Sequence, residues 1–151
     1  MIPDLALLFT RDLNRVMAEI RAYPDEDSLW QVAGQINNSA GNLTLHLVGN
    51  ISQFIGDDLG DVPFTRNREA EFTRRNVPRA ELLSGLQRTS ELVEQTLAHL
   101  NDARLDRIHP RQPPGLPPAM TSRCFLLHLY GHLNCHLGQI NYHRRLTVPE
   151  D

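Results

Sequence analysis

Cysteine is scarce in this chain: only Cys124 and Cys135 occur among its 151 residues. On one helix these two side chains would lie roughly 16 Å apart along the axis. That distance is too large for a disulfide bond. The sequence therefore excludes a disulfide-stapled fold, and we expect a protein of the reducing cytoplasm.

Long apolar runs, blocks of like charge and a basic leader are also missing. Without an apolar run long enough to cross a bilayer, we expect no membrane-spanning helix. The net charge is only -3, which argues against nucleic acid or an anionic membrane as a partner. Residues 1–4 carry no basic side chain ahead of the first apolar stretch, so we expect no signal peptide.

No segment alternates apolar and polar residues for long, so no β-sheet is predicted. Instead, apolar residues recur every three or four positions, the period of an amphipathic helix, in four segments: 3–21, 39–56, 78–100 and 121–146. Four such helices joined by one long connection predict an all-α fold, a four-helix bundle. At this length we expect a single domain spanning residues 1–151.

The two longer connections differ in composition. Residues 57–77 are polar, and we expect irregular structure there. Residues 101–119 contain five prolines, which prevent a helix from continuing. This proline-rich segment either crosses from one end of the bundle to the other or covers a site.

The fourth predicted helix carries His128, His132 and His136, three histidines spaced by four residues. At about 100° per residue, His132 and His136 lie inside the apolar stripe, and His128 lies at its edge. Gln139 falls beside His136. Imidazoles at positions i and i+4 can reach one divalent ion, so His132 and His136 are the predicted metal-binding pair.

A metal site normally needs a third protein ligand, and His46 is the best placed. His46 and Asn50 flank the apolar stripe of the second predicted helix, and bundle metal sites are built from facing helices. The alternatives are a hydrogen-bonded or half-exposed His46 and a solvent-facing histidine pair. Asn50, His128 and Gln139 are candidates for orienting the ligands or a substrate.

The other histidines have simpler interpretations. His99 and His109 are predicted to lie at the surface, and His143 to stabilise the helix C-terminus or to form a rim contact. Trp30 is predicted to belong to the core. The charged segment 66–71 either lines the mouth of a pocket or forms a solvated, salt-bridged loop.

The histidine pattern resembles that of the DinB-like superfamily of four-helix-bundle metalloenzymes. The likeness lies in His46 and in His132-x3-His136-Leu-Gly-Gln-Ile, and it covers nearly the whole chain. The segments 38–50 and 66–72 resemble an uncharacterised subfamily. The resemblance implies His46, His132 and His136 as ligands of a divalent metal, zinc or nickel, in a homodimer. It also implies a thiol-dependent transferase or isomerase, with a low-molecular-weight thiol as cosubstrate.

Three functional hypotheses follow. The first is a metal-dependent enzyme acting on a small molecule, either a thiol-dependent transferase or a hydrolase, because a divalent ion lowers the pKa of a bound thiol or water. A zincin-type peptidase is disfavoured, since no HExxH motif occurs. The second is a non-catalytic, metal-stabilised binding or dimerisation module. The third is a plain bundle with structural histidines.

Overall fold

The computed structural model describes residues 1–147, and its regular structure is helical. Within these residues there is no strand, only an isolated β-bridge between Ile108 and Thr121. No helix in the described part of the chain has both the length and the apolarity that crossing a membrane requires. Residues 148–151, the end of the predicted domain 1–151, lie outside the described residues.

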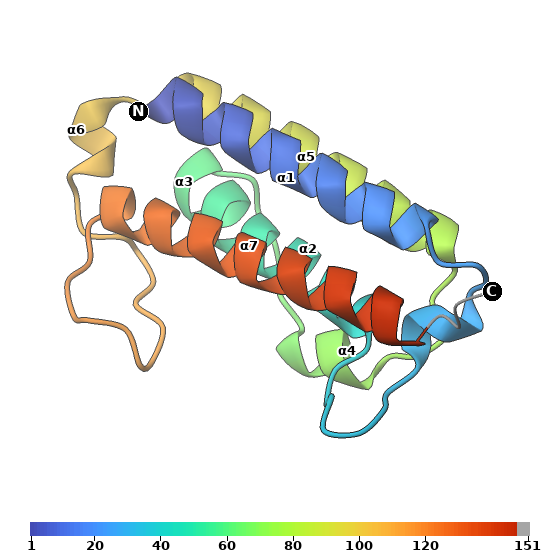
Figure 1. The fold of residues 1–151 in the computed structure, drawn as a ribbon. Helices are drawn as coiled ribbons and strands as arrows, with labels where there is room; N and C mark the ends of the chain where they lie inside the picture. Colours follow the sequence, from blue (N-terminus) through green and yellow to red (C-terminus); the bar gives the residue numbers. More distant parts are fainter. Residues whose placement is uncertain (148–151) are drawn as a thin grey trace.

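Four helices make up most of the structure, and they match the predicted segments closely (Figure 1). They are α1 (Ile2–Arg21), α2 (Ala40–Ile51), α5 (Arg79–His99) and α7 (Ser122–Thr147). Ser39 caps α2, because its hydroxyl oxygen accepts a hydrogen bond from the Asn42 backbone N–H. The predicted ends of α1, α5 and α7 are each within one residue of the observed ends.

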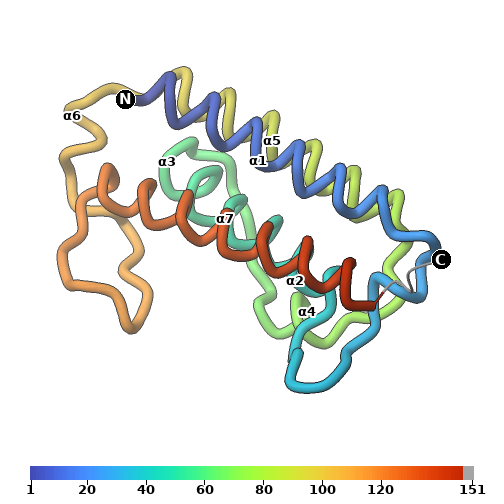
Figure 2. Tube along the Cα trace, in the orientation of Figure 1, coloured from blue at the N-terminus to red at the C-terminus, as the bar shows by residue number. Residues whose placement is uncertain are grey.

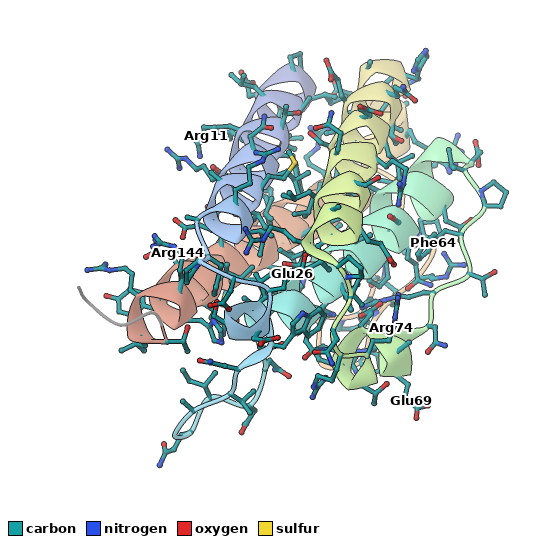
Figure 3. All side chains as sticks on the ribbon, turned by 90° about the vertical axis from the view of Figure 1, so that its right-hand side faces the viewer. Arg11, Glu26, Phe64, Glu69, Arg74 and Arg144 are labelled. Carbon is teal, nitrogen blue, oxygen red and sulfur yellow. The ribbon has the colours of Figure 1, made fainter. Side chains whose placement is uncertain are left out.

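The four helices enclose one apolar core. Helix α1 packs against α5 and α7, and α2 contacts the same two helices from the other side. The tube in Figure 2 shows α1 and α5 running antiparallel along most of their length. Viewed from the side in Figure 3, side chains fill the space between the helices. Fully buried residues come from all four, including Phe9, Leu47, Leu86 and Phe125, and Trp30 is buried as predicted.

The chain after α2 is more helical than predicted. Helix α2 continues without a break into a π-helical stretch, η2 (Ser52–Asp57), and a last turn, α3 (Asp58–Gly60). The left-handed backbone of Asp61, with φ of 52°, ends this run. The segment 57–77, expected to be irregular, also contains α4 (Arg68–Thr73). Asn67 caps α4, and α4 packs against α2, a tertiary contact that sequence periodicity cannot reveal.

Two other short helices lie in the connections. A 3-10 turn, η1 (Asp27–Trp30), follows α1, and α6 (Asp102–Leu105) follows α5. The remaining part of the proline-rich segment is an extended loop, which returns the chain to the start of α7 (Figure 1).

The prediction that His109 lies at the surface is wrong. Its side chain is 1% exposed and stacks on Phe125, with 4.1 Å between the ring centroids. Burial, with Arg111 and Arg104 nearby, lowers the pKa of His109 to about 4, so the ring is neutral at pH 7. Its Nε2 lies 3.1 Å from the Asp58 carboxylate and its Nδ1 lies 3.3 Å from Ser122 Oγ. These bonds tie the proline-rich loop to α3 and α7.

His143 is also more deeply placed than predicted. It is 2% exposed rather than a rim residue, because the connection after η1 covers it. Its Nε2 donates to the Gln31 carbonyl at 2.8 Å, and the Tyr23 hydroxyl lies 2.7 Å from its Nδ1. A carbonyl acceptor and a hydroxyl donor satisfy both ring nitrogens of a neutral imidazole. His143 therefore joins α7 to the connection between α1 and α2.

Asp12 links α1 to α7 and provides a test of the fold. Its fully buried carboxylate accepts hydrogen bonds from Arg11, at 2.8 Å from Nε, and from the Tyr130 hydroxyl, at 2.7 Å. The hydrogen bond from Arg11 is the main cause that lowers the Asp12 pKa to about 2. A pKa below the unfolded value means that this stability is present above about pH 4 and is lost as the pH falls towards 2.

We expect Asp12→Asn to lower the free energy of unfolding by about 1–2 kcal/mol at pH 7. The difference from the wild type should shrink as the pH falls from 4 towards 2. Urea unfolding followed by circular dichroism at several pH values measures it. Asp4→Asn is the matched control on α1, because the Asp4 side chain is 79% exposed. A difference that stays constant with pH would contradict this role for the Asp12 charge.

Candidate metal centre

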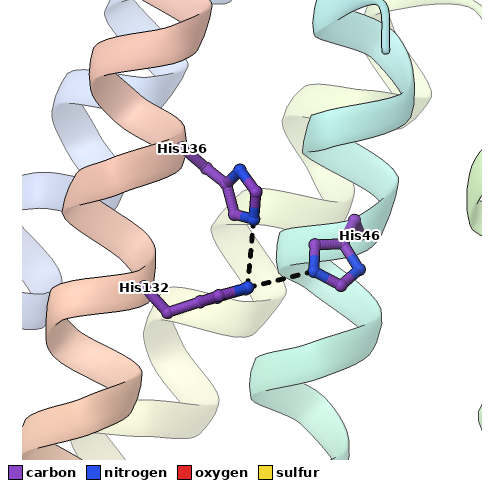
Figure 4. A group of neighbouring side chains, drawn as sticks. All are labelled: His46, His132 and His136. Carbon is purple, nitrogen blue, oxygen red and sulfur yellow. Dashed lines mark hydrogen bonds between the residues drawn. The ribbon is translucent and has the colours of Figure 1, made fainter. Parts of the chain in front are cut away.

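The three predicted histidines meet between α2 and α7. Figure 4 shows the rings of His46 and His136 both facing the tip of the His132 ring. The His132 Nε2 atom lies 3.1 Å from His46 Nε2 and 3.0 Å from His136 Nε2. One nitrogen atom from each of the three rings lies within 4.8 Å of the corresponding nitrogen atoms of the other two. The helical spacing brings His132 and His136 together, and the packing of α2 against α7 adds His46.

Glu71, on α4, fixes the protonation of His46. The Glu71 Oε2 atom lies 2.8 Å from His46 Nδ1, and the Arg66 guanidinium holds the same carboxylate at 2.6 and 2.8 Å. Arg66 Nη2 is also 3.2 Å from His46 Nδ1, but a carboxylate at the shorter distance requires the proton to be on Nδ1. His46 Nε2 therefore carries the lone pair that faces His132.

This carboxylate stays ionised. Burial acts to raise the pKa of Glu71, but the hydrogen bonds from Arg66 and His46 outweigh it, and the pKa lies below its usual value. An ionised carboxylate behind an imidazole is the usual partner of a metal-binding histidine, because it orients the ring and makes the opposite nitrogen more basic. Arg66, Glu71 and His46 thus form one hydrogen-bonded chain.

Gln139 plays the corresponding part for His136. Its amide oxygen lies 2.6 Å from His136 Nδ1, so it accepts the proton of that nitrogen. The lone pair of His136 is then on Nε2, which faces His132. That Gln139 orients a metal ligand stays a prediction.

The donor set fits a divalent cation better than it fits hydrogen bonding alone. The lone pairs of His46 Nε2 and His136 Nε2 both face the single Nε2 atom of His132. A proton on His132 Nε2 can form a good hydrogen bond with only one of them. If His132 carries its proton on Nδ1 instead, three lone pairs point towards one another with no proton between them. Tetrahedral zinc, with Zn–N bonds of about 2.0–2.1 Å, places its ligand nitrogens about 3.3 Å apart. The observed separations of 3.1 and 3.0 Å are close to this value.

The electrostatics also favour neutral imidazoles. Burial is the main cause that lowers the His132 pKa to about 3, and the neighbouring rings of His136 and His46 lower it further. Burial likewise lowers the pKa of His136, against the opposing effect of Gln139. Neutral imidazoles are the form that binds metals. His132 and His136 are therefore held in the neutral form that a metal site needs.

A cavity of about 640 Å³ opens beside the cluster. His46 and His132 contribute to its wall, together with Asn50, His128, Arg66 and Arg68. The His128 ring is 6.3 Å from that of His132, centroid to centroid, and it lies outside the three-nitrogen group. Asn50 and His128 line this cavity, and among the described residues neither forms a hydrogen bond to His46, His132 or His136. Their role in orienting the ligands or a substrate stays a prediction.

A family model, described as the DinB superfamily, matches residues 8–140. The chain belongs to the DinB superfamily. The matched region contains His46, His132 and His136, together with Glu71, Arg66 and Gln139, whose side chains contact His46 or His136. No curated protein matches this DinB chain.

The role of Glu71 in this DinB protein is not predicted by the sequence pattern. The sequence predicts that the charged segment 66–71 either lines the mouth of a pocket or forms a solvated, salt-bridged loop. Both interpretations hold in part, because Arg66 pairs with Glu71 and also lines the cavity. The sequence does show a carboxylate, Glu71, in a short charged segment. Its contact with His46, however, depends on how α4 packs against α2.

Proposed function

We propose that this DinB protein is a metal-dependent enzyme whose His46, His132 and His136 bind one divalent ion. The observation that carries the proposal is the convergence of the three imidazole nitrogens beside a cavity of about 640 Å³. Imidazole ligands suit zinc and nickel. A three-histidine ion keeps a coordination position for a small molecule, and when bound it acts as a Lewis acid that lowers the pKa of a coordinated thiol or water.

The reaction we propose is transfer of a low-molecular-weight thiol to an electrophilic small molecule, with metal-dependent hydrolysis as the alternative. The family supports thiol transfer. The cavity supports an enzyme over a non-catalytic, metal-stabilised module, because a purely structural metal site is normally closed by four protein ligands. Its volume lies in the range of small-molecule sites.

The remaining sequence predictions become part of this proposal. The mutual contacts of α1, α2, α5 and α7 support one four-helix-bundle domain. Exposed apolar side chains on α7, Leu127, Tyr142 and Leu146, support a homodimer. The free, exposed thiols of Cys124 and Cys135 support a reducing cytoplasm.

Elemental analysis of protein purified without a histidine tag tests the proposal. We expect about one zinc or nickel ion per chain, lost in His136→Ala. Metal-loaded protein should then accelerate the loss of free thiol from a mixture of cysteine and 1-chloro-2,4-dinitrobenzene, whereas chelator-stripped protein should not. Absence of bound metal after incubation with either ion would overturn the metal centre, and metal binding without thiol transfer would favour hydrolysis or the non-catalytic module.

A further inference from the structure

The cavity beside the histidines has one basic wall and one apolar wall. Arg66, Arg68 and Arg111 contribute guanidinium groups, and no acidic side chain is among the described residues that line it. The apolar wall comes from residues of η2, α7 and the proline-rich loop: Phe54, Leu116, Phe125 and Leu129. Such a cavity suits a small molecule with an anionic end and a carbon skeleton.

Two of the three arginines have carboxylate partners outside the cavity lining. Arg66 is paired with Glu71, which itself binds His46. Arg111 is paired with Asp57 at 2.9 Å and with Asp58. These pairs fix the positions of the guanidinium groups and offset much of their charge. Arg66 and Arg111 therefore supply oriented hydrogen-bond donors more than net positive charge.

Arg68 is the uncompensated cation of the cavity. Within residues 1–147 it has no carboxylate within ion-pair distance, and its guanidinium carbon lies 5.4 Å from the centre of the Phe72 ring. Arg68 is exposed at the start of α4, so its charge is available to a ligand. A planar guanidinium binds a carboxylate through two parallel hydrogen bonds.

Asn50 provides a second, independent sign of a ligand site. The residue is 8% exposed and lines the cavity, yet its Oδ1 atom accepts no hydrogen bond from any of residues 1–147. Leaving a buried carbonyl oxygen without a hydrogen-bond donor is unfavourable. A hydroxyl or amino group of a bound molecule would satisfy it.

We propose that this cavity binds a small organic acid, with the carboxylate on Arg68 and the carbon skeleton against Phe54 and Phe125. This inference rests on the proposed function, because it makes the acid a substrate of the centre at His46, His132 and His136. The apolar wall favours an organic acid over free phosphate, which has no carbon skeleton to bury. Asn50 then accepts a hydrogen bond from a polar group on that skeleton.

Binding of 3-phenylpropanoate and its neutral analogue 3-phenylpropanamide tests the inference. Isothermal calorimetry on the wild type, both as purified and after chelator treatment, should show the acid binding about tenfold more tightly than the amide. Arg68→Gln should bring the two affinities close to equal. Arg88→Gln is the matched control, because Arg88 is an exposed arginine on α5 whose side chain, within residues 1–147, forms a hydrogen bond only with Ser84.

Equal affinities for acid and amide in the wild type, or no binding of either, would overturn the inference. A preference for the acid that survives in Arg68→Gln would do the same, as would inorganic phosphate binding as tightly as the acid. A preference seen only in metal-loaded protein would place the carboxylate on the ion and not on Arg68. Because the chelator-treated protein is measured separately, failure of the metal centre leaves this test intact.

Discussion

Replacement of His132 by alanine is expected to remove stoichiometric metal binding while leaving the helical structure intact. His132 is central to the cluster, since its Nε2 is the atom that approaches both His46 and His136. In this variant only two of the three ligands remain, and the imidazoles of His46 and His136 alone cannot hold the ion with comparable affinity. We expect the metal content to fall from about one ion per chain to near zero, measured after dialysis against a competing chelator. His46→Ala should have the same effect.

The alanine variants should remain folded, because the cluster of buried hydrophobic residues that packs the four helices together stays complete. His99→Ala is the matched control, since His99 is an exposed histidine on α5 whose only hydrogen bond among the described residues is to the Gln95 carbonyl. His128→Ala is a sharper control, because this histidine lines the cavity beside His132 without joining the nitrogen cluster. Normal metal content in both His132→Ala and His46→Ala would show that the assignment of the ligands is wrong.

Much of the architecture follows from helical periodicity. The apolar stripe of α7 places Phe125, Leu129 and Ile140 in the core. The same geometry carries His132 and His136 towards α2, so their approach to His46 could be predicted once the two helices were assumed to face each other. Local signals also mark the helix ends, such as the cap at Ser39. These features depend on residues close together in the sequence.

Helical periodicity cannot predict contacts that depend on how a loop folds back onto the helices. The contact between Glu71 and His46 requires α4 to fold back onto α2, across 25 positions of sequence. The sequence predicts His109 at the surface, yet the loop turns inward and buries the ring against Phe125. The π-helical stretch at Ser52–Asp57 likewise has no signal in the apolar pattern, which continues through it.

Glu71→Gln is expected to weaken metal binding by about 10- to 100-fold without abolishing it. Glutamine keeps the shape of the side chain, but it removes the charge that makes His46 more basic and that pairs with Arg66. Loss of such a partner behind a ligand histidine typically has this magnitude. Competition with a chromogenic chelator measures the affinity. An unchanged affinity would show that the carboxylate does not act through His46.

Gly49→Ala tests the same contact without changing any polar group. A methyl group at position 49 on α2 would overlap Glu71 Oε1, and Arg66 holds that carboxylate in place. Alanine should therefore displace Glu71 and lower the metal affinity in the same direction as Glu71→Gln. Gly131→Ala on α7 is the matched control, because within residues 1–147 no atom lies within 4 Å of the added carbon apart from its chain neighbours and the nearby backbone of its own helix.

The control should keep its metal affinity and gain about 1 kcal/mol of stability, since alanine favours a helix more than glycine does. In a double variant, Gly49→Ala should add little to the loss in affinity caused by Glu71→Gln, because both changes act on one hydrogen bond. Losses that instead add in full would mean that position 49 affects the metal by another route. The comparison thus separates the orientation of His46 by Glu71 from a general disturbance of α2.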